Sequence, residues 1–382
     1  MPVKVKEKEK SISEVFELLE GLKSVGEATV ETKAEMETEI IRSPEPPRNM
    51  IEAWEKDFVD GYEWKTFGGK PCSYERLWKA FNRKENILLC GPSGCGKSTI
   101  AFALMDRANE EARAKNRAIM AENFAKLKAG VSEEDLEYKW VSLERKLNHY
   151  SCHEATRSED LVGALTIIFD ELGNRTPFRV DGALKEAWTE GNTFICEEYD
   201  LALPGVWGET HQFLDGRTKE TMIYINGPEK IYKSKNFGAL FTGNTKGRGE
   251  NQAEFADTKP MNTAFMNRMT FVVEVGWLKP EVEIGLIHKT TGLRGDVCKK
   301  MVLAAKQSRD AHAEGTADCA ITTRDLKSWA RECVDNEAEW GNPTDRDKYW
   351  NDVAVPSAYP TVFARIDDPN TVEMFERYLS LR

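Results

Sequence analysis

The sequence predicts an α/β fold in which a parallel sheet is followed by a domain of helices. Three observations support this prediction. Short apolar segments alternate with helix-like segments between residues 86 and 275, as a parallel sheet requires. A glycine-rich segment at 91–98 lies directly between an apolar strand and an apolar helix. Residues 279–335 are then mostly helix-like, without strand-like runs.

The composition is typical of a globular protein that is large enough for two domains. The chain has 382 residues, of which 40% are hydrophobic and 31% are charged, and its formal net charge is −11. No apolar run approaches the ~18 residues that span a bilayer, and the first ten residues lack the apolar stretch of a secretory signal. We therefore expect a cytoplasmic protein without a membrane partner. The acidic balance argues mildly against a protein that coats nucleic acid.

The eight cysteines are scattered and contain no C-x-x-C pair, so they are expected to be small buried apolar residues. His149, Cys152 and His153 form the one cluster in the sequence with ligand character. This cluster lacks a fourth ligand and lies in a strand-like stretch. A packed strand is therefore favoured over a metal site.

Residues 1–50 form the first expected region, a disordered or docking arm. They are rich in Lys, Glu, Ser and Thr and end in a proline-rich segment at 44–47. Five apolar residues within this region share one helical face: Ile12, Val15, Leu18, Leu19 and Leu22. The favoured interpretation is a helix that lies on the protein's own body. The alternative is a docking helix for a partner.

Residues 51–277 are expected to form the α/β domain. A helix-rich lead-in with aromatic anchors occupies 51–86, and residues 86–90 form a short buried strand. The helix after the glycine-rich segment is expected to run from Lys97 to about Arg107. A helical lid at 278–335 and a C-terminal extension at 336–382 follow the domain. Further strands of the sheet are expected at 148–152, 192–196, 221–225, 238–243 and 271–275.

Residues 108–147 are highly charged and strongly helical, and we expect them to form an antiparallel helical hairpin inserted in the α/β domain. Gly130 separates two runs of apolar residues with 4-then-3 spacing, and Ser132 with Asp135 resembles a capping box. The alternative is one long helix with a kink. The two runs are Met120, Phe124 and Leu127, and then Leu136, Trp140, Leu143 and Leu147.

The glycine-rich segment matches the phosphate-binding loop G-x-x-x-x-G-K-[ST]. Its glycines let backbone N–H groups curl around phosphate oxygens, and the following helix presents its positive end. Lys97 is expected to reach the β- and γ-phosphates, and the Ser98 hydroxyl to ligate Mg²⁺. The sequence therefore predicts an ATPase that uses ATP and Mg²⁺. Its predicted nucleotide-binding residues are Gly91, Pro92, Ser93, Gly94, Cys95, Gly96, Lys97, Ser98 and Thr99.

Two strand ends supply the acids and the amide that such a site needs. Glu197 and Glu198 follow the apolar strand at 193–196. Glu197 is expected to act on magnesium, and Glu198 to polarise the attacking water. Glu-Glu pairs are common on solvated surfaces, but this pair follows a buried-looking strand. Asn244 ends the next apolar strand, and it can orient the water between Glu198 and the γ-phosphate.

These motifs resemble those of the AAA+ ATPases of the MoxR group, in the dynein-related AAA subfamily. The likeness is to the branch that contains the cobaltochelatase subunit CobS and the activases CbbQ and NorQ. It covers roughly residues 85–335, in family order. Besides the phosphate loop, it is carried by Asp160–Gly163, Phe178–Leu184, Glu197–Ala202, Phe213–Arg217, Asn244, Met266–Arg268, Thr322–Arg324 and Trp329–Ala330.

The resemblance implies an AAA+ domain with a helical lid that works as a ring, most often a hexamer. Asn244 then corresponds to sensor 1, Arg268 to the arginine finger that reaches a neighbour's site, and Arg324 to the sensor 2 residue. Residues 160–163 match the opening of an extra hairpin. Two departures matter: Glu197 stands where the family has Asp, and 108–147 and 336–382 have no counterpart.

The sequence says less about what the ATPase acts on than about the ATPase itself. The favoured hypothesis is an ATPase that remodels or activates a partner protein, often one with a von Willebrand A domain in this family. One alternative is the ATPase subunit of a cobalt or magnesium chelatase. The other is a nucleic-acid motor, for which there is a basic cluster of Lys230, Lys233, Lys235, Lys246 and Arg248.

Overall fold

The computed structural model describes residues 55–380 apart from 65, 68–69, 133–145, 170–174, 225–227 and 248–257. The chain divides into two compact units. One comprises residues 50–108 and 145–382, and the other comprises residues 1–49 and 109–144. The expected N-terminal arm, most of the second run of the 108–147 segment, and Arg248 lie outside the described residues.

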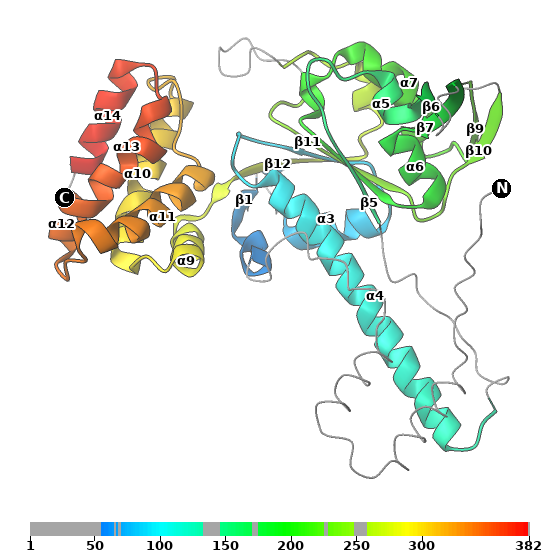
Figure 1. The fold of residues 1–382 in the computed structure, drawn as a ribbon, viewed down its shortest axis with the longest axis horizontal. Coiled ribbons are helices and arrows are strands. Elements are labelled where there is room, and N and C mark those ends of the chain that lie inside the picture. Colours follow the sequence, from blue (N-terminus) through cyan, green and yellow to red (C-terminus); the bar gives the residue numbers. More distant parts are fainter. Residues whose placement is uncertain are drawn as a thin grey trace. The chain divides into compact units, whose positions relative to one another are not determined.

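A six-stranded sheet lies at the centre of the first unit (Figure 1). All its strands from β12 to β5 are parallel, which confirms the predicted parallel sheet. β1 pairs antiparallel with β12, and it lies in the lead-in that was predicted to be helix-rich. In spatial order the strands are β1 (Tyr62–Trp64), β12 (Phe271–Leu278), β4 (Ile87–Cys90), β11 (Gly238–Gly243), β8 (Thr193–Glu197) and β5 (Leu147–Ser151).

The central strands are buried on both faces, because alternate side chains enter two separate hydrophobic clusters. Ile87 and Leu89 of β4 belong to a cluster with α3 (Tyr74–Asn82) and the first turns of α4 (Lys97–Lys128). Leu88 and Cys90 belong to a second cluster, on the opposite face. A strand between two layers of helices needs a continuous apolar run, which residues 87–90 supply. The second cluster includes residues of α5 (Ser158–Val162), α6 (Ala183–Glu190), η3 (Tyr199–Leu201), α7 (Pro204–Leu214) and α8 (Thr263–Met266).

The helix after the phosphate loop is longer than the sequence analysis predicts. α4 runs from Lys97 to Lys128, so its expected end near Arg107 is wrong. Residues 108–128 are rich in Ala, Glu, Lys and Arg, which are strong helix formers, and contain no Gly or Pro. Nothing in that stretch therefore stops the helix. It ends two residues before Gly130, whose φ is +87°.

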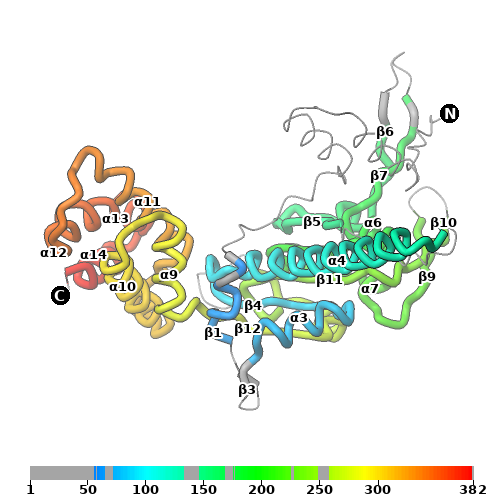
Figure 2. The backbone as a smooth tube through the Cα atoms, turned by 90° about the horizontal axis from the view of Figure 1, so that it is seen from below, coloured from blue at the N-terminus to red at the C-terminus, as the bar shows by residue number. Residues whose placement is uncertain are grey.

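Short two-stranded pairs lie outside the main sheet. β6 (Gly163–Phe169) and β7 (Arg175–Asp181) form a hairpin between α5 and α6, where the resemblance places an extra hairpin. Figure 2 shows this hairpin projecting from the helices. Near the start of the described chain, η1 (Glu55–Gly61) precedes β1, and β2 (Thr66–Phe67) pairs with β3 (Lys70–Pro71).

One predicted strand is misplaced. β9 (Glu220–Ile223) pairs with β10 (Glu229–Tyr232) in a separate hairpin, so the expectation that 221–225 joins the parallel sheet is wrong. Ile223 is the one buried residue of β9. A strand with polar, exposed positions does not fit between two layers of helices, whereas it suits a surface hairpin.

The helices after β12 form a bundle around one hydrophobic cluster (Figure 1). Trp329 Nε1 donates to the carbonyl of Ala354 at 2.6 Å, and Trp350 Nε1 donates to the carbonyl of Leu379 at 2.9 Å. The helices on both sides of residue 335 therefore share one core. They are α9 (Pro280–Thr291), α10 (Gly295–Ala313), α11 (Thr323–Trp340), α12 (Arg346–Tyr349), the π-helical turn η5 (Trp350–Ala354), α13 (Val355–Thr361), the 3₁₀ turn η6 (Phe363–Arg365) and α14 (Pro369–Ser380).

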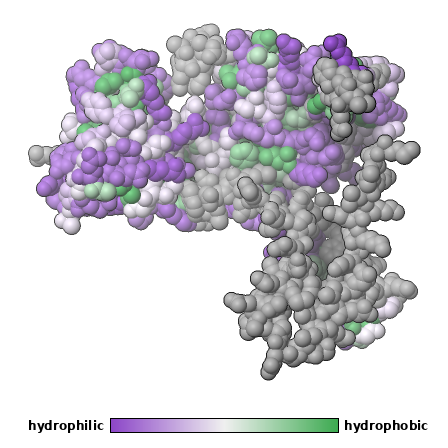
Figure 3. Space-filling model, viewed as in Figure 1, coloured by the Kyte–Doolittle hydropathy of each residue, from purple (hydrophilic) through white to green (hydrophobic). Residues whose placement is uncertain are grey.

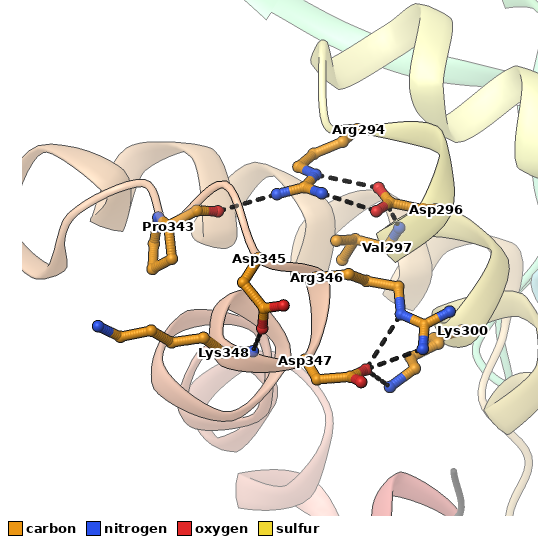
Figure 4. Close-up of polar contacts among 9 residues, drawn as sticks. All are labelled: Arg294, Asp296, Val297, Lys300, Pro343, Asp345, Arg346, Asp347 and Lys348. Carbon is orange, nitrogen blue, oxygen red and sulfur yellow. Dashed lines mark hydrogen bonds and ion pairs between the residues drawn. The ribbon is translucent and has the colours of Figure 1, made fainter.

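Polar contacts also join α10 and the turn before it to α12 and to the segment that precedes α12 (Figure 4). Arg294 donates to the Pro343 carbonyl at 2.9 Å and to Asp296 at 2.7 Å, and Lys300 pairs with Asp347 at 2.8 Å. The Asp347 side chain is 62% exposed. Because ion pairs with a solvent-exposed partner contribute little to stability, we expect the hydrophobic cluster to hold the C-terminal helices in place.

The surface is predominantly hydrophilic in the view of Figure 3, where apolar residues form small, separate patches. Among the helices that the structure describes, none combines the length and the apolar character that crossing a membrane requires.

We predict that Trp350→Ala destabilises the bundle by about 3–5 kcal/mol, because it removes a buried indole and leaves a cavity. Asp347→Ala, the control three residues earlier, should leave the unfolding midpoint nearly unchanged. Urea unfolding followed by circular dichroism measures both. Equal losses in the two variants would show that the charges of Figure 4, rather than the cluster, hold the C-terminal helices.

Candidate functional site

The phosphate loop lies between the end of β4 and the start of α4, and its glycines are required by their surroundings. Gly94 has φ of +71° and Gly96 has φ of +107°, values that other residues rarely adopt. A Cβ at Gly96 would overlap the Tyr62 hydroxyl, and a Cβ at Gly94 would lie 2.8 Å from Cβ of Thr322. The loop is therefore closed in by β1 on one side and by the start of α11 on the other.

Lys97 is almost fully buried inside this loop. Its Nζ donates to the carbonyls of Gly91 at 2.8 Å and Pro92 at 2.7 Å, and to Oδ1 of Asn244 at 3.0 Å. An ammonium group that is held by neutral acceptors can exchange them for phosphate oxygens, which are stronger, charged acceptors. The structure thus brings Lys97 and Asn244 together, as the sequence analysis requires.

A pocket of about 320 Å³ opens beside the loop. Its polar lining contains the predicted residues that come from four separate segments: Lys97, Ser98, Glu197, Glu198, Asn244 and Arg324. Its apolar lining contains residues that were not predicted as site residues: Phe58, Tyr62, Leu278 and Leu286. Aromatic and aliphatic side chains beside a phosphate loop suit a nucleotide base.

A larger pocket, of about 670 Å³, shares Ser93 and Asn244 with the first, and Gly91 and Pro92 line only this larger one. Ser98, Glu197 and Glu198 do not line it. The smaller pocket is therefore the candidate site, because the phosphate loop, the two acids and Asn244 meet there.

Glu197 ends β8 and makes a contact that the sequence analysis missed. Its Oε2 lies 2.7 Å from Nε2 of His149, on the neighbouring strand β5. This hydrogen bond is the main cause that lowers the pKa of Glu197, with smaller contributions from the Ser98 hydroxyl and from Arg324, while burial opposes them. The same hydrogen bond raises the pKa of His149. The parallel register places Ser151 opposite Glu197 and His149 opposite Ile195, so the contact is a diagonal one between neighbouring strands, for which the sequence carries no signal.

Glu198 follows in an unusual backbone conformation. Its φ of +53° and ψ of 40° lie in the left-handed region, which non-glycine residues rarely occupy. The next residue starts η3, so the chain turns sharply at Glu198. Its side chain is exposed and lines the pocket, whereas Tyr199 and Asp200 are fully buried. Strained residues of this kind gather at functional sites.

Asp200 is a second residue that the sequence analysis did not select as a site residue, although it lies within 197–202, one of the segments that carry the resemblance. Its Oδ2 accepts hydrogen bonds from the backbone N–H of Asn244 at 2.9 Å and of Thr245 at 2.8 Å, and from the Thr245 hydroxyl at 2.9 Å. Asp200 is 0% exposed. This buried carboxylate fixes the tip of β11 relative to the turn that carries Glu198.

Arg324 and Arg268 lie in different surroundings. Arg324, in the first turn of α11, lines the pocket together with Lys327. Arg268 donates to the carbonyls of His211 at 3.2 Å and Ala264 at 2.7 Å, and it does not line this pocket. One chain therefore brings the predicted residues Ser93–Thr99, Glu197, Glu198, Asn244 and Arg324 to one pocket. Arg268 lies outside it, and Gly91 and Pro92 line the larger pocket and contact Lys97 through their carbonyls.

The donors in the pocket fit magnesium. Ser98 supplies a hydroxyl and Glu197 a carboxylate, and Mg²⁺ prefers oxygen ligands. The sulfurs of Cys152 and Cys196 lie 3.4 Å apart, but both cysteines are buried in the hydrophobic cluster beside the helices. They line neither of the two pockets at the phosphate loop.

Comparison with known proteins agrees with this geometry. Residues 136–257 match the family model of the AAA domain (dynein-related subfamily). The matched stretch begins after the phosphate loop and includes Glu197, Glu198 and Asn244. The chain thus carries an AAA domain on the AAA+ P-loop fold, which confirms the resemblance.

The individual relatives are distant. The chain is 26% identical over 176 residues to the aerobic cobaltochelatase subunit CobS of a Sinorhizobium species, a match that covers 45% of this chain and 52% of CobS. It is 22% identical over 219 residues to an uncharacterized protein of Staphylococcus saprophyticus, covering 57% of this chain and 66% of that one. The chain thus spans about half to two thirds of these relatives. A solved structure of the RuvB Holliday junction branch migration motor of Thermotoga maritima aligns with a TM-score of 0.41 and 10% identity, over 80% of this chain and 72% of that chain.

We predict that Lys97→Ala weakens the binding of a fluorescent adenine nucleotide by about two orders of magnitude, because charge-assisted hydrogen bonds to phosphate are lost. Lys306→Ala, at an exposed position of α10, is the control and should bind normally. Fluorescence titration at fixed magnesium measures both variants. Normal binding by Lys97→Ala would place the nucleotide elsewhere.

Proposed function

We propose that this protein is an ATPase that works in an oligomeric ring and couples ATP hydrolysis to the remodelling or activation of a partner protein. One observation carries the proposal. A single pocket is lined by Lys97, Ser98, Glu197, Glu198, Asn244 and Arg324, which come from four separate segments, while Arg268 does not line it. The similarity to an AAA domain and to CobS supports the same activity.

Each residue of the pocket has a role in this proposal. Lys97 and the loop N–H groups hold the phosphates, and Ser98 and Glu197 would hold Mg²⁺, which neutralises phosphate charge when it is bound. Glu198 accepts a hydrogen bond from the attacking water and polarises it. Asn244, held by Asp200, orients that water. Arg324 stabilises the charge that develops on the phosphoryl oxygens.

In a ring, the arginine that the pocket of one chain lacks would come from Arg268 of the neighbouring chain. Arg268 is half-buried, and backbone carbonyls on α7 and α8 hold its guanidinium group. A guanidinium group carries five N–H donors, and these two carbonyls do not occupy all of them. In a ring, that group reaches the γ-phosphate in the neighbour's pocket. We infer a hexamer in the cytoplasm, as in the family that the sequence resembles.

The partner is proposed to be a protein, in this family often one with a von Willebrand A domain. A second candidate function rests on the similarity to CobS, whose name describes a cobaltochelatase subunit. In that case the ring would drive a separate metal-inserting subunit. Identification of the captured partner, as described below, distinguishes the two.

A nucleic-acid motor is less well supported, because much of the basic cluster is neutralised. Lys230 pairs with Glu220 at 2.8 Å, and Lys246 pairs with Glu274. Lys233 is half-buried and lies over the ring of Phe237, and burial lowers its pKa. Cations that are paired or buried do not form a path for phosphates.

We predict that Glu198→Gln binds ATP with normal affinity and hydrolyses it at least about a hundredfold more slowly, because the amide cannot act as a base. Phosphate release measures hydrolysis, and titration measures binding. The ATP-locked ring should also retain its partner in a pull-down better than the ADP form does. A Gln variant with normal turnover would exclude Glu198 and make Glu197 the candidate.

The role of Arg268 in trans is tested by mixing two inactive variants. An arginine finger contributes roughly 10³–10⁵ in rate, so Arg268→Ala should bind ATP and hydrolyse it poorly. In a ring that also contains Lys97→Ala subunits, an intact Lys97 pocket can face an intact Arg268, and activity should return in part. Sizing with ATP must first establish that the subunits exchange. If they mix without recovery, Arg268 does not act across the interface.

A further inference from the structure

The joint between the sheet and the helical bundle contains a fully buried acid. β12 ends at Leu278, and α9 starts two residues later, with Lys279 as its N-cap. Glu283 lies in the first turns of α9 and is 0% exposed. A carboxylate needs charged or strong hydrogen-bonding partners to remain in such a place. It touches no reacting group, so the proposed ATPase mechanism does not use it.

Arg309 of α10 is the charged partner of Glu283. Its two terminal nitrogens donate to the two carboxylate oxygens at 2.8 and 2.9 Å, which is the bidentate arrangement. Nε donates to the carbonyl of Ile321 at 2.9 Å. The guanidinium group lies 4.2 Å from the ring centre of Trp277, the second-last residue of β12. One side chain thus contacts the last strand of the sheet, α9 and the segment that leads into α11.

Thr323 brings the same ion pair to the start of α11. Its hydroxyl donates to Oε1 of Glu283 at 2.6 Å. The preceding residue, Thr322, is the N-cap of this helix and forms a capping box with Asp325. Ile321 N–H donates to the hydroxyl of Ser308, on α10, at 2.9 Å. The first turn of α11 is therefore held by Glu283 of α9, and the segment that leads into it is held by Ser308 of α10.

This first turn also meets the nucleotide pocket, as does Leu286 of α9. Thr322 lies against the phosphate loop, where even a Cβ at Gly94 would come within 2.8 Å of its side chain. Thr323 and Arg324 both line the pocket, and the charge of Arg324 contributes to the lowered pKa of Glu197. The peptide unit between Thr323 and Arg324 thus connects the buried ion pair to the pocket.

We propose that Glu283, Arg309 and Thr323 are positioning residues for ATP hydrolysis. They set the place of Arg324 at the phosphates, and they tie that place to the angle at which the bundle leaves β12. This inference rests on the proposed ATPase function and goes beyond it. Glu283 and Arg309 bind no substrate themselves, and they act through Thr323 on Arg324.

The chemistry of the cluster supports positioning over stabilisation. Removing two charges from water is costly, and apolar residues of the same volume often stabilise a core equally well. The bundle already has a large apolar cluster of its own. A bidentate ion pair instead fixes orientation, because its hydrogen bonds are satisfied in only one arrangement of α9, α10 and α11.

Thr323→Val is the sharpest test, because it removes the hydroxyl and keeps the shape and the β-branch. We expect kcat to fall between about tenfold and a hundredfold, as small misplacements of catalytic groups do. KM and the unfolding midpoint should change little. Thr323→Ser, which keeps the hydroxyl, should restore most of kcat. A lower unfolding midpoint without a specific decrease in kcat would overturn the proposal.

Two further variants separate positioning from general damage. In an Arg324→Ala background, Thr323→Val should cause no further loss of kcat, because its effect passes through Arg324. Additive losses would contradict this. Thr371→Val is the matched control, since this threonine is also fully buried and donates to a carboxylate, that of Asp368, at 2.7 Å. It should cost stability and leave kcat unchanged.

The outcomes also separate this inference from the proposed function. A wild-type protein without ATPase activity overturns the proposed function. The positioning role is then measured by the preference for a non-hydrolysable ATP analogue over ADP, which Thr323→Val should reduce as Arg324→Ala does. A wild-type protein that hydrolyses ATP, with a Thr323→Val variant that matches it in kcat and in this preference, overturns the inference alone.

Discussion

The site depends on the parallel alignment of β4, β8 and β11. In this sheet Gly243 of β11 lies opposite Cys90 of β4, and Phe241 lies opposite Cys196 of β8. The three strands therefore end at the same edge, and whatever follows each of them in the sequence must meet there. The phosphate loop follows β4, the two acids end β8, and Asn244 follows β11. The buried carboxylate of Asp200 then locks the last two together.

The helical bundle completes the pocket from the other side, and its rigidity makes this useful. Buried aromatic residues such as Trp329 and Trp350 hold the C-terminal helices against α10 and α11. A well-packed bundle moves as one body, so the direction of α9 at the joint determines where the first turn of α11 lies. The Glu283–Arg309 pair is at that joint. Nucleotide chemistry and the angle of the bundle are consequently coupled through one turn of helix.

The departure of Glu197 from the Asp of the family has a structural counterpart. Glutamate is one methylene longer, and its carboxylate is held between the Ser98 hydroxyl and His149 on β5. His149 is 40% exposed, and its ring packs edge-on against Phe102 of α4. The histidine thus restrains the longer side chain at the position where the pocket needs an acid.

The sequence by itself determined the parallel sheet, the phosphate loop, the paired acids and Asn244, because each depends on local patterns: apolar runs, glycines and the residues that end strands. It did not determine where α4 ends, because helix-forming residues continue past Arg107 without a stop. It also placed 221–225 in the wrong sheet, because the sequence pattern of a strand does not specify which strand it pairs with. The contacts of Glu197 with His149 and of Glu283 with Arg309 join residues 48 and 26 positions apart. Only the tertiary structure could decide these contacts, because a side chain's partner across such a separation depends on how strands and helices pack, not on sequence spacing.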